Sequence, residues 1–422
     1  MKPSCYNLYI PLKNNHYILF NTFTTAIFFV DEELKTAIQN DPSSIPEKAV
    51  PDFKKEWVLI DDDFNERDVI TVKRNESVFN SPYLSFTILT TTNCNLDCPY
   101  CFEKKGTTTM DTSTCERVIE CIKKFIAKYR PIELNIRIFG GEPLLYMDPM
   151  VTVLDYFTGY CTEHSVDFTA DITTNGTLLT QDVMTQLEKY PMGVAQVTLD
   201  GPKDMHNKKR IYKNGKGTYE DIISALHILK DSFMELKVRI NVDSTNKDAI
   251  PILLDDLKER GLGGILVYFG IVRPLSPECE AYDKSCMTDL ETSHVIPVLW
   301  KAALQRGFQV PLKVTPNLVG CGMQSASAYT IGLDGYIYKC VTKVGHPEQS
   351  VGHVHAEDMP HWSPEYYTWL SRNPLEFSEC KSCIYFPLCG GGCPMIAYSK
   401  KGTYQAGGCF ETKNILREQI KM

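Results

Sequence analysis

Strands and helices alternate along most of this chain from Pro82 onward, and this alternation limits the possible folds more than any other feature. Apolar runs predict strands at 84–90, 133–139, 166–173, 194–199, 236–242 and 264–270. Amphipathic segments near 111–129, 148–163, 180–190, 218–231, 248–260 and 288–306 predict helices between and after them. This order is typical of βα units around a parallel sheet. Because six units fall short of the eight that close a barrel, the sequence predicts an α/β fold with a partial (β/α)6 TIM-like barrel.

Polar or glycine-rich sequence follows four successive predicted strands. These segments are 94–101, 140–143, 173–177 and 200–202, the last with His206 and Arg210 shortly beyond it. In a parallel barrel the C-terminal ends of the strands meet at one edge, where active sites lie. Gly, Asn and Pro are also ordinary turn formers. Four such segments in a row nevertheless predict a shared site at this edge.

The first of these segments carries three cysteines, Cys94, Cys98 and Cys101, in the spacing Cys-x3-Cys-x2-Cys. Soft thiolate ligands select iron-sulfur clusters or zinc over hard cations. The simpler alternatives are half of a zinc site and buried packing. A structural zinc site needs four ligands, but the next cysteine, Cys115, falls on a predicted helix. The loop therefore favours an iron-sulfur cluster with one iron that no protein ligand holds.

This spacing, with the aromatic Tyr100 before the third cysteine, resembles the signature of the radical S-adenosylmethionine (SAM) enzymes. The resemblance implies that the three cysteines hold a [4Fe-4S] cluster whose open iron binds SAM and delivers the electron that cleaves it. It also implies that the Gly-Gly-Glu-Pro run contacts the methionine amino group of SAM; this run is Gly140, Gly141, Glu142 and Pro143. Paired glycines let a ligand approach the backbone closely, and a carboxylate suits an ammonium group.

Three further residues are candidates for the carboxylate and ribose ends of SAM: Thr198, Asp200 and Arg210. Arginine suits a carboxylate because its guanidinium group donates two parallel hydrogen bonds. Asp200-Gly201-Pro202 is also a good turn on its own.

Seven cysteines lie from Cys321 onward, and part of this tail has the spacing Cys-x2-Cys-x5-Cys-x3-Cys. Taken alone, that spacing also fits a zinc knuckle. Together with the earlier motif it resembles the SPASM extension of radical SAM enzymes that modify peptides and proteins. The resemblance implies two auxiliary [4Fe-4S] clusters, one held by Cys380, Cys383, Cys389 and Cys409 and the other by Cys321, Cys340 and Cys393. With the first cluster, the chain would hold three.

The second auxiliary cluster has only three predicted ligands. Some members of the family supply a fourth cysteine shortly after the first, but residues 323–327 contain no thiol. Cys279 or Cys286 is a possible substitute, although small apolar filler is the simpler interpretation of both. If neither binds, the open iron is free to hold a substrate thiolate, an arrangement that suits thioether formation.

The first 80 residues predict a small α+β region. Residues 6–12 and 16–20 favour a β-hairpin, a helix is expected near Asp31 with its end at Pro42, and 56–60 is a further strand. The region loosely resembles the leader-recognition domains fused to peptide maturases, in which an exposed strand binds a leader by β-augmentation. We therefore expect three domains: 1–80, the partial barrel 81–315, and the auxiliary-cluster region 316–422.

The amino-acid composition limits the cellular compartment and the classes of binding partner that we expect. Sixteen cysteines without an apolar signal segment argue for metal or catalysis in a reducing cytoplasm, not for disulfides. No stretch of about 18 apolar residues predicts a membrane span. The net charge of −8 gives no footprint for nucleic acid, and the cluster Lys208-Lys209-Arg210 favours a solvated face.

The resemblance implies a radical SAM/SPASM maturase that modifies a ribosomally made precursor peptide with a leader, most simply by forming a thioether from a substrate Cys. It also implies an external low-potential electron donor of the flavodoxin or ferredoxin type. One alternative is an anaerobic sulfatase maturase, which makes formylglycine; the N-terminal region and the missing eighth cluster cysteine count against it. Carbon-carbon crosslinking and epimerisation stay open. The alternative of another class is a non-catalytic zinc-binding module.

Overall fold

The computed structural model describes residues 1–355, 360–409 and 412–422. The chain forms two compact units. The barrel unit consists of residues 81–311 and 326–371, and the terminal unit of 1–80, 312–325 and 372–422. Both ends of the chain therefore belong to the same unit, and the barrel lies between them in sequence.

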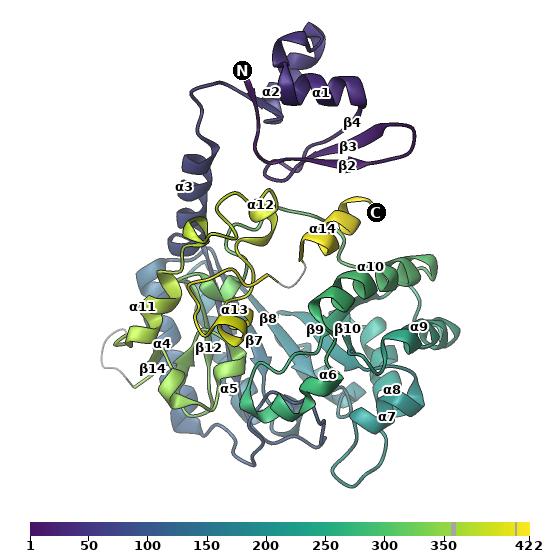
Figure 1. Ribbon diagram of the computed structural model, residues 1–422. Helices are drawn as coiled ribbons and strands as arrows, with labels where there is room; N and C mark the ends of the chain where they lie inside the picture. The colour runs from purple at the N-terminus through teal and green to yellow at the C-terminus, as the bar shows by residue number, and fades with distance from the viewer. Residues whose placement is uncertain (356–359, 410–411) are drawn as a thin grey trace. The chain divides into compact units, whose positions relative to one another are not determined.

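The barrel unit is built on six parallel strands that pair in chain order (Figure 1). They are β6 (Tyr83–Leu89), β7 (Glu133–Phe139), β8 (Asp167–Thr174), β9 (Met192–Leu199), β10 (Glu235–Val242) and β11 (Leu266–Ile271). Each lies within two residues of its predicted bounds. The α/β partial barrel is thus confirmed.

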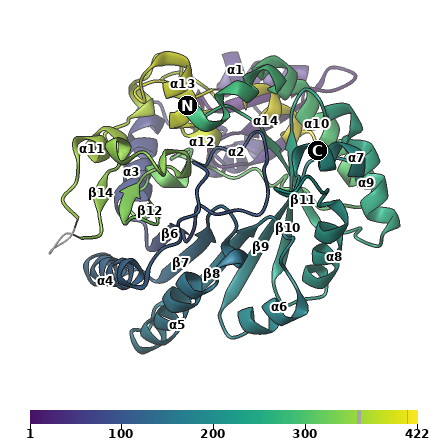
Figure 2. The ribbon, with the colours of Figure 1, turned by 90° about the horizontal axis from the view of Figure 1, so that it is seen from below.

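The two faces of this sheet differ sharply in polarity. Alternate residues such as Phe86, Ile136, Val197 and Val238 are completely buried on one face, which the helices cover (Figure 2). These helices are α4 (Thr112–Tyr129), α5 (Asp148–Glu163), α6 (Gln181–Leu187), α8 (Tyr219–Lys230), α9 (Ile250–Glu259) and α10 (Asp289–Gln305). The residues that alternate with these apolar ones in the strands line the inner face and include many polar side chains, such as Asn135, Arg137, Asp171, Gln196 and Arg239. An inner face that is not an apolar core leaves room for a polar ligand.

Three strands extend the sheet beyond the six that the sequence predicted. They are β12 (Ala328–Ile331), β13 (Tyr336–Tyr338) and β14 (Gly352–His353). β12 pairs in parallel with β6, with Phe86 opposite Tyr329, and β13 and β14 follow as antiparallel neighbours. The chain thus returns after the last βα unit to cover the free edge of the first strand.

The N-terminal part of the terminal unit confirms the predicted hairpin and adds a strand to it. Its sheet has the order β2 (Asn7–Pro11), β3 (His16–Asn21), β4 (Ile27–Asp31), so β4 is an edge strand. Helix α1 (Glu32–Asn40) begins where predicted, because the Asp31 side chain accepts a hydrogen bond from the Leu34 amide. The remaining elements here are β1 (Lys2–Pro3), β5 (Leu59–Ile60), α2 (Val50–Lys55) and α3 (Glu66–Phe79).

The same unit contains the cysteine-rich tail. Its helices are α12 (Phe386–Cys389), α13 (Pro394–Lys401) and α14 (Thr412–Ile420), whereas α7 (Lys203–Lys209) and α11 (Pro364–Leu370) belong to the barrel unit. One apolar cluster joins the two halves of the terminal unit, with Tyr6 and Ile70 from the first and Leu375 and Phe386 from the second. In the described ranges, no helix has the length and apolarity that a membrane crossing needs.

Candidate active site

The cysteine loop leaves the end of β6 and is fixed by its neighbours' backbones. The Gly141 amide donates to the Thr91 carbonyl and the Glu142 amide to the Asn93 carbonyl, each at 2.8 Å. Burial raises the pKa of the Cys94 thiol to about 11 and that of Cys101 to about 12. Each of these pKa values also responds to the neighbouring cysteines, so the three sulfurs lie close together.

The paired glycines, Gly140 and Gly141, allow the backbone after β7 to lie directly against the cysteine loop. A Cβ atom on Gly140 would lie 2.6 Å from the Thr91 carbonyl oxygen, and one on Gly141 would lie 2.4 Å from that of Asn93. Either contact is shorter than two packed atoms allow, so only glycine fits at both positions. We expected these glycines to make room for a ligand; the structure shows that the cysteine loop itself occupies the space.

Glu142 is completely buried and joins two strand ends. Its Oε1 accepts from the Leu144 amide at 3.0 Å and from the Thr174 hydroxyl at 2.7 Å, and its Oε2 accepts from the Asn175 amide at 2.7 Å. Burial raises the pKa of this carboxyl, whereas these donors lower it. A carboxylate accepts about four hydrogen bonds, so one position is left for a cation such as an ammonium group. Pro143 follows as the first residue of a short 3-10 turn.

The segment after β8 binds directly to the cysteine loop. Asn175 donates from Nδ2 to Asn95 Oδ1 at 2.8 Å and contacts Cys94 Sγ at 3.8 Å, while Asn95 donates to Thr177 Oγ1 at 2.8 Å. The first three predicted segments are therefore brought together, although Asn95, Asn175 and Thr177 were not singled out as site residues.

The fourth segment reaches the same loop through Tyr100. The Tyr100 hydroxyl donates a short hydrogen bond to Asp200 Oδ2 and accepts one from Arg210 Nη1 at 3.1 Å. Burial raises the pKa of Asp200, and Arg210 opposes this rise. Burial alone would lower the pKa of Arg210, but Tyr100, Cys98 and Asp200 raise it well above its usual value. Thr198 is buried at the end of β9, and no hydrogen bond between its side chain and these groups is seen among the described residues.

His206 fixes the backbone of Asp200 through a hydrogen bond. Its Nδ1 accepts from the Asp200 amide at 3.3 Å, and its Nε2 contacts Thr218 Oγ1 at 3.0 Å. Burial, followed by the charge of Arg210, lowers the pKa of His206 well below its usual value. His206 is therefore a neutral positioning residue that accepts a hydrogen bond at Nδ1 and donates one from Nε2 to Thr218.

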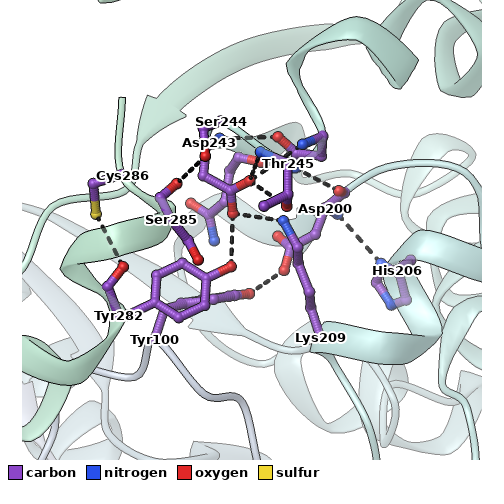
Figure 3. A network of polar contacts seen from close by, with 12 residues as sticks. Tyr100, Asp200, His206, Lys209, Asp243, Ser244, Thr245, Tyr282, Ser285 and Cys286 are labelled. Carbon is purple, nitrogen blue, oxygen red and sulfur yellow. Dashed lines mark hydrogen bonds and ion pairs between the residues drawn. The ribbon is translucent and has the colours of Figure 1, made fainter. Parts of the chain in front are cut away.

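A buried ion pair lies next to this network (Figure 3). Lys209 Nζ donates to Asp243 Oδ2 at 2.5 Å, and the Tyr282 hydroxyl donates to the same oxygen at 2.7 Å. The rings of Tyr282 and Tyr100 meet edge to face with centroids 5.6 Å apart. The prediction that Lys208-Lys209-Arg210 forms a solvated face is wrong for its last two members, which are buried because each has a partner here. Asp243 and Tyr282 gave no local signal in the sequence.

A cavity of about 300 Å³ opens beside the cysteines. It is lined by Cys98, Pro99, Cys101, Glu103, Lys105 and Glu278. Burial and the nearby Glu142 raise the pKa of Glu103 to about 8, and its Oε2 is buried with no hydrogen-bond partner in the described part of the chain. Glu278 accepts from His346 Nε2 at 3.1 Å. The cavity thus presents two thiols and two partly buried carboxyl groups to any ligand.

Charged side chains continue down the inner face of the sheet. Arg137 on β7 pairs with Asp171 on β8 at 3.1 Å and is half exposed. Arg239 on β10 donates from Nε to Asn241 Oδ1 at 2.7 Å and lies 5.7 Å from the ring centre of Tyr268. A Cβ on Gly270 would lie 2.5 Å from the Arg239 guanidinium, so this glycine makes room for it. Among the described residues, no carboxylate pairs with Arg239.

Four tail cysteines lie near one another in the terminal unit. The pKa of Cys380 is raised to about 12 by burial and then by the neighbouring thiols of Cys389, Cys409 and Cys383. The loop between Cys389 and Cys393 contains three consecutive glycines with positive φ. A Cβ on Gly408 would lie 2.0 Å from the Cys393 carbonyl oxygen, so two cysteine segments are in backbone contact.

Within the described ranges, no three His, Cys, Asp or Glu side chains converge as the ligands of one metal ion would. A cubane spaces its thiolates more widely, because each sulfur binds a different iron. The other predicted set is divided between the units, with Cys321 and Cys393 in one and Cys340 in the other, so its convergence stays a prediction. Cys279 contacts Ser276, and Cys286 contacts the Tyr282 carbonyl.

Comparison with known protein families matches residues 88–262 to the Radical SAM superfamily. This range contains the cysteine loop and the three other strand-end segments described above. A cysteine-type anaerobic sulfatase-maturating enzyme of Clostridium novyi is 24% identical, over 71% of this chain and 85% of its own length. A radical SAM cyclopropyl synthase, TigE, of Paramaledivibacter caminithermalis is 25% identical, over 97% of this chain and 93% of its own length.

Among solved structures, Streptococcus suis SuiB bound to the precursor peptide SuiA has the same fold, with a TM-score of 0.57 at 16% sequence identity. The match covers 97% of this chain and 98% of SuiB, so it includes the terminal unit as well as the barrel.

Proposed function

We propose that this chain, which is a radical SAM superfamily enzyme distantly related to peptide-modifying SPASM-type enzymes, modifies a ribosomally made precursor peptide by forming a thioether from a substrate Cys. The observation that carries the proposal is the combination, in one chain, of an open strand edge in the terminal unit and a polar inner barrel face. The open strand edge suits the binding of an extended leader peptide. The polar inner face of the barrel suits the segment of the substrate that is modified.

At the strand ends, the chain's own groups would bind and orient SAM. Cys94, Cys98 and Cys101 would hold the first [4Fe-4S] cluster, and Glu142 would accept a hydrogen bond from the ammonium group of SAM. Arg210, fixed by Tyr100 and Asp200, would pair with its carboxylate. When bound, the cluster and SAM supply a carbon radical that removes one hydrogen atom from the substrate.

After this abstraction, thioether formation removes one proton and one electron. The substrate loses a C–H and an S–H bond and gains a C–S bond; one hydrogen leaves with the 5′-deoxyadenosyl group, and the other leaves as a proton and an electron. The tail cysteines would hold two auxiliary [4Fe-4S] clusters that accept this electron. An external donor of the flavodoxin or ferredoxin type would supply the electron that starts the reaction.

The free edge of β4 is the proposed site for the leader segment. Ile27 and Phe29 stand on its outer face and are 55% and 75% exposed, whereas Val30 points into the core. A cavity of about 340 Å³ adjoins the strand, lined by Ala26, Ile27, Phe28, Asp52, Lys55 and Glu56. An added strand would pair with the free backbone groups of β4 and cover these apolar side chains. SuiB, which spans the same regions, binds a precursor peptide.

The test uses anaerobically reconstituted enzyme and any short Cys-containing peptide that is found encoded beside its gene. We expect a product that has lost two hydrogen atoms and whose crosslinked Cys no longer reacts with iodoacetamide, together with 5′-deoxyadenosine. Phe29→Asp should lower kcat/KM by about 10- to 100-fold, the value of burying a Phe side chain. Phe79→Asp, at an exposed phenylalanine of α3, is the matched control. Modification of a peptide that contains no Cys would overturn thioether chemistry.

One specific observation favours a second function, the oxidation of a Cys or Ser in a protein to formylglycine. The sulfatase-maturating relative is as similar in sequence as TigE, although it matches 71% of this chain and not 97%. A product aldehyde that reacts with a hydrazide probe would establish this function. The alternative of a non-catalytic zinc module is wrong, because the chain is a radical SAM enzyme.

A further inference from the structure

Arg372 is the largest fully buried side chain in the described chain, and its guanidinium group holds three cysteine-bearing segments together. Its Nε donates to the Tyr404 carbonyl, its Nη1 to Gln324 Oε1, and its Nη2 to the carbonyls of Gly391 and Ala406, at 2.8–2.9 Å. Gln324 lies shortly after Cys321, Gly391 lies between Cys389 and Cys393, and Ala406 precedes Cys409. All four acceptors are uncharged.

No carboxylate compensates this charge among the residues that the structure describes. A second buried arginine, Arg74, donates from its Nη2 to the Arg372 carbonyl at 2.6 Å, and within the described ranges its Nε has no hydrogen-bond partner. Burial lowers the pKa of Arg372 to about 10, which leaves it charged at neutral pH. An unpaired buried charge costs several kcal/mol. The fold therefore maintains two adjacent cations in an interior that supplies no anion.

The thiols of the tail cysteines are the groups that would supply the missing negative charge. The pKa of Arg372 is raised by the neighbouring Cys380, Cys393 and Cys389, against the larger effect of burial. Cys380 and Cys389 belong to one predicted auxiliary set, and Cys393 belongs to the other. Four thiolates around a [4Fe-4S] core carry a net negative charge, which becomes more negative when the cluster accepts an electron. A guanidinium group beside these cysteines would stabilise that charge in both redox states.

We propose that Arg372 is the counter-charge of the auxiliary iron-sulfur clusters and raises their reduction potential, so that the tail accepts the electron released when the product bond forms. The inference rests on the proposed auxiliary clusters. A nearby positive charge stabilises the reduced cluster more than the oxidised one, since reduction adds a negative charge. Arg372 would thus act through its charge and its hydrogen bonds to the cysteine segments, and not through contact with the substrate.

The test measures the potential of the tail clusters alone. In the Cys94→Ala/Cys98→Ala/Cys101→Ala background, a redox titration followed by electron paramagnetic resonance gives their midpoint potentials. Arg372→Gln should lower a midpoint potential by about 59 mV, which is a tenfold change in the equilibrium constant of a one-electron reduction. Arg372→Lys keeps the charge and should shift it much less. Arg67→Gln is the matched control, because Arg67 lies in the same unit but pairs with Glu376 at 2.7 Å.

Each result decides between the proposals. An unchanged potential in Arg372→Gln with intact clusters overturns the role of Arg372 and leaves the proposed function standing. If the variant that lacks only Cys94, Cys98 and Cys101 contains no iron, the proposal of auxiliary clusters is itself overturned. If Arg372→Gln loses its clusters, assembly in Arg372→Lys supports the counter-charge, whereas loss in both variants reduces Arg372 to a structural clamp and overturns the proposal.

Discussion

The two cysteine-rich regions differ in the buried polar groups that lack a partner among the described residues. Beside the loop of Cys94, Cys98 and Cys101, two carboxyl oxygens have no hydrogen-bond partner, Glu103 Oε2 and Asp200 Oδ1, and one guanidinium nitrogen, Arg210 Nε, also has none. The buried Glu142 carboxylate there has no cation in hydrogen-bond contact within the described chain. Near the tail cysteines, the buried charged groups that lack a counter-charge in the described ranges are the guanidinium groups of Arg74 and Arg372. Because an unpaired buried charge is costly, each surplus indicates the charge of the expected ligand. Carboxylates suit the cationic SAM, and arginines suit anionic clusters.

The strongest way to separate the two regions is to replace Cys94, Cys98 and Cys101 with Ala. Cleavage of SAM to 5′-deoxyadenosine should fall to background, because no thiolate remains to hold the first cluster. The tail should keep about eight irons per chain, four in each of two cubanes. Iron analysis and chromatography of the nucleoside measure both. Loss of the tail iron as well would show that the regions do not assemble independently.

The cost of an unpaired charge can be measured at Lys209 and Asp243. Lys209→Met leaves the buried Asp243 carboxylate without its cation and should lower the free energy of unfolding by about 3–5 kcal/mol. The double variant Lys209→Met/Asp243→Asn removes both charges and should recover much of this loss. Chemical denaturation measures both variants. Equal losses in the two would mean that the packing of the lysine matters and its charge does not.

A substitution at Glu142 tests whether its unpaired negative charge binds the cationic SAM. Glu142→Gln removes the charge while nearly preserving the shape, and the dissociation constant for SAM should rise about 10- to 100-fold, as expected for a charge-assisted hydrogen bond. Equilibrium dialysis under anaerobic conditions measures it. Thr174→Val is the matched control, because it removes a hydrogen bond to Glu142 and leaves the carboxylate charged. A similar effect of both variants would assign Glu142 a structural role only.

The smallest effect is expected at Arg239, where the unpaired cation faces the accessible inner face of the sheet. Arg239→Gln should raise KM for the peptide about threefold to tenfold, because a partly exposed charge contributes on the order of 1 kcal/mol. Lys237→Gln, on the same strand but paired with Glu235, is the control. A fall in kcat with unchanged KM would contradict a role in peptide binding.

Secondary structure was predictable where burial follows a simple period. The six parallel strands are apolar on alternate residues and were located within two residues. Helix α3 was missed because its buried face includes Glu66 and Arg74, which hide the helical period. Strands β12–β14 were missed because they are short and pair with a strand far away in sequence.

The candidate site was predictable where its residues are adjacent in sequence. The cysteine loop and the Gly-Gly-Glu-Pro run carry their pattern within a few residues. The ion pair of Lys209 with Asp243 joins positions 34 residues apart, and Arg372 acts on segments 19 to 48 residues away. Such contacts depend on how the chain folds back on itself, and no local spacing encodes them.

The pairing of β12 with β6 has a consequence for biosynthesis. Residues 90–327 must leave the ribosome before β12 reaches the edge of β6. Until then the nascent barrel exposes an unpaired apolar strand, which is a template for aggregation. Truncation before Ala328 should therefore yield insoluble chains even though all six βα units are present.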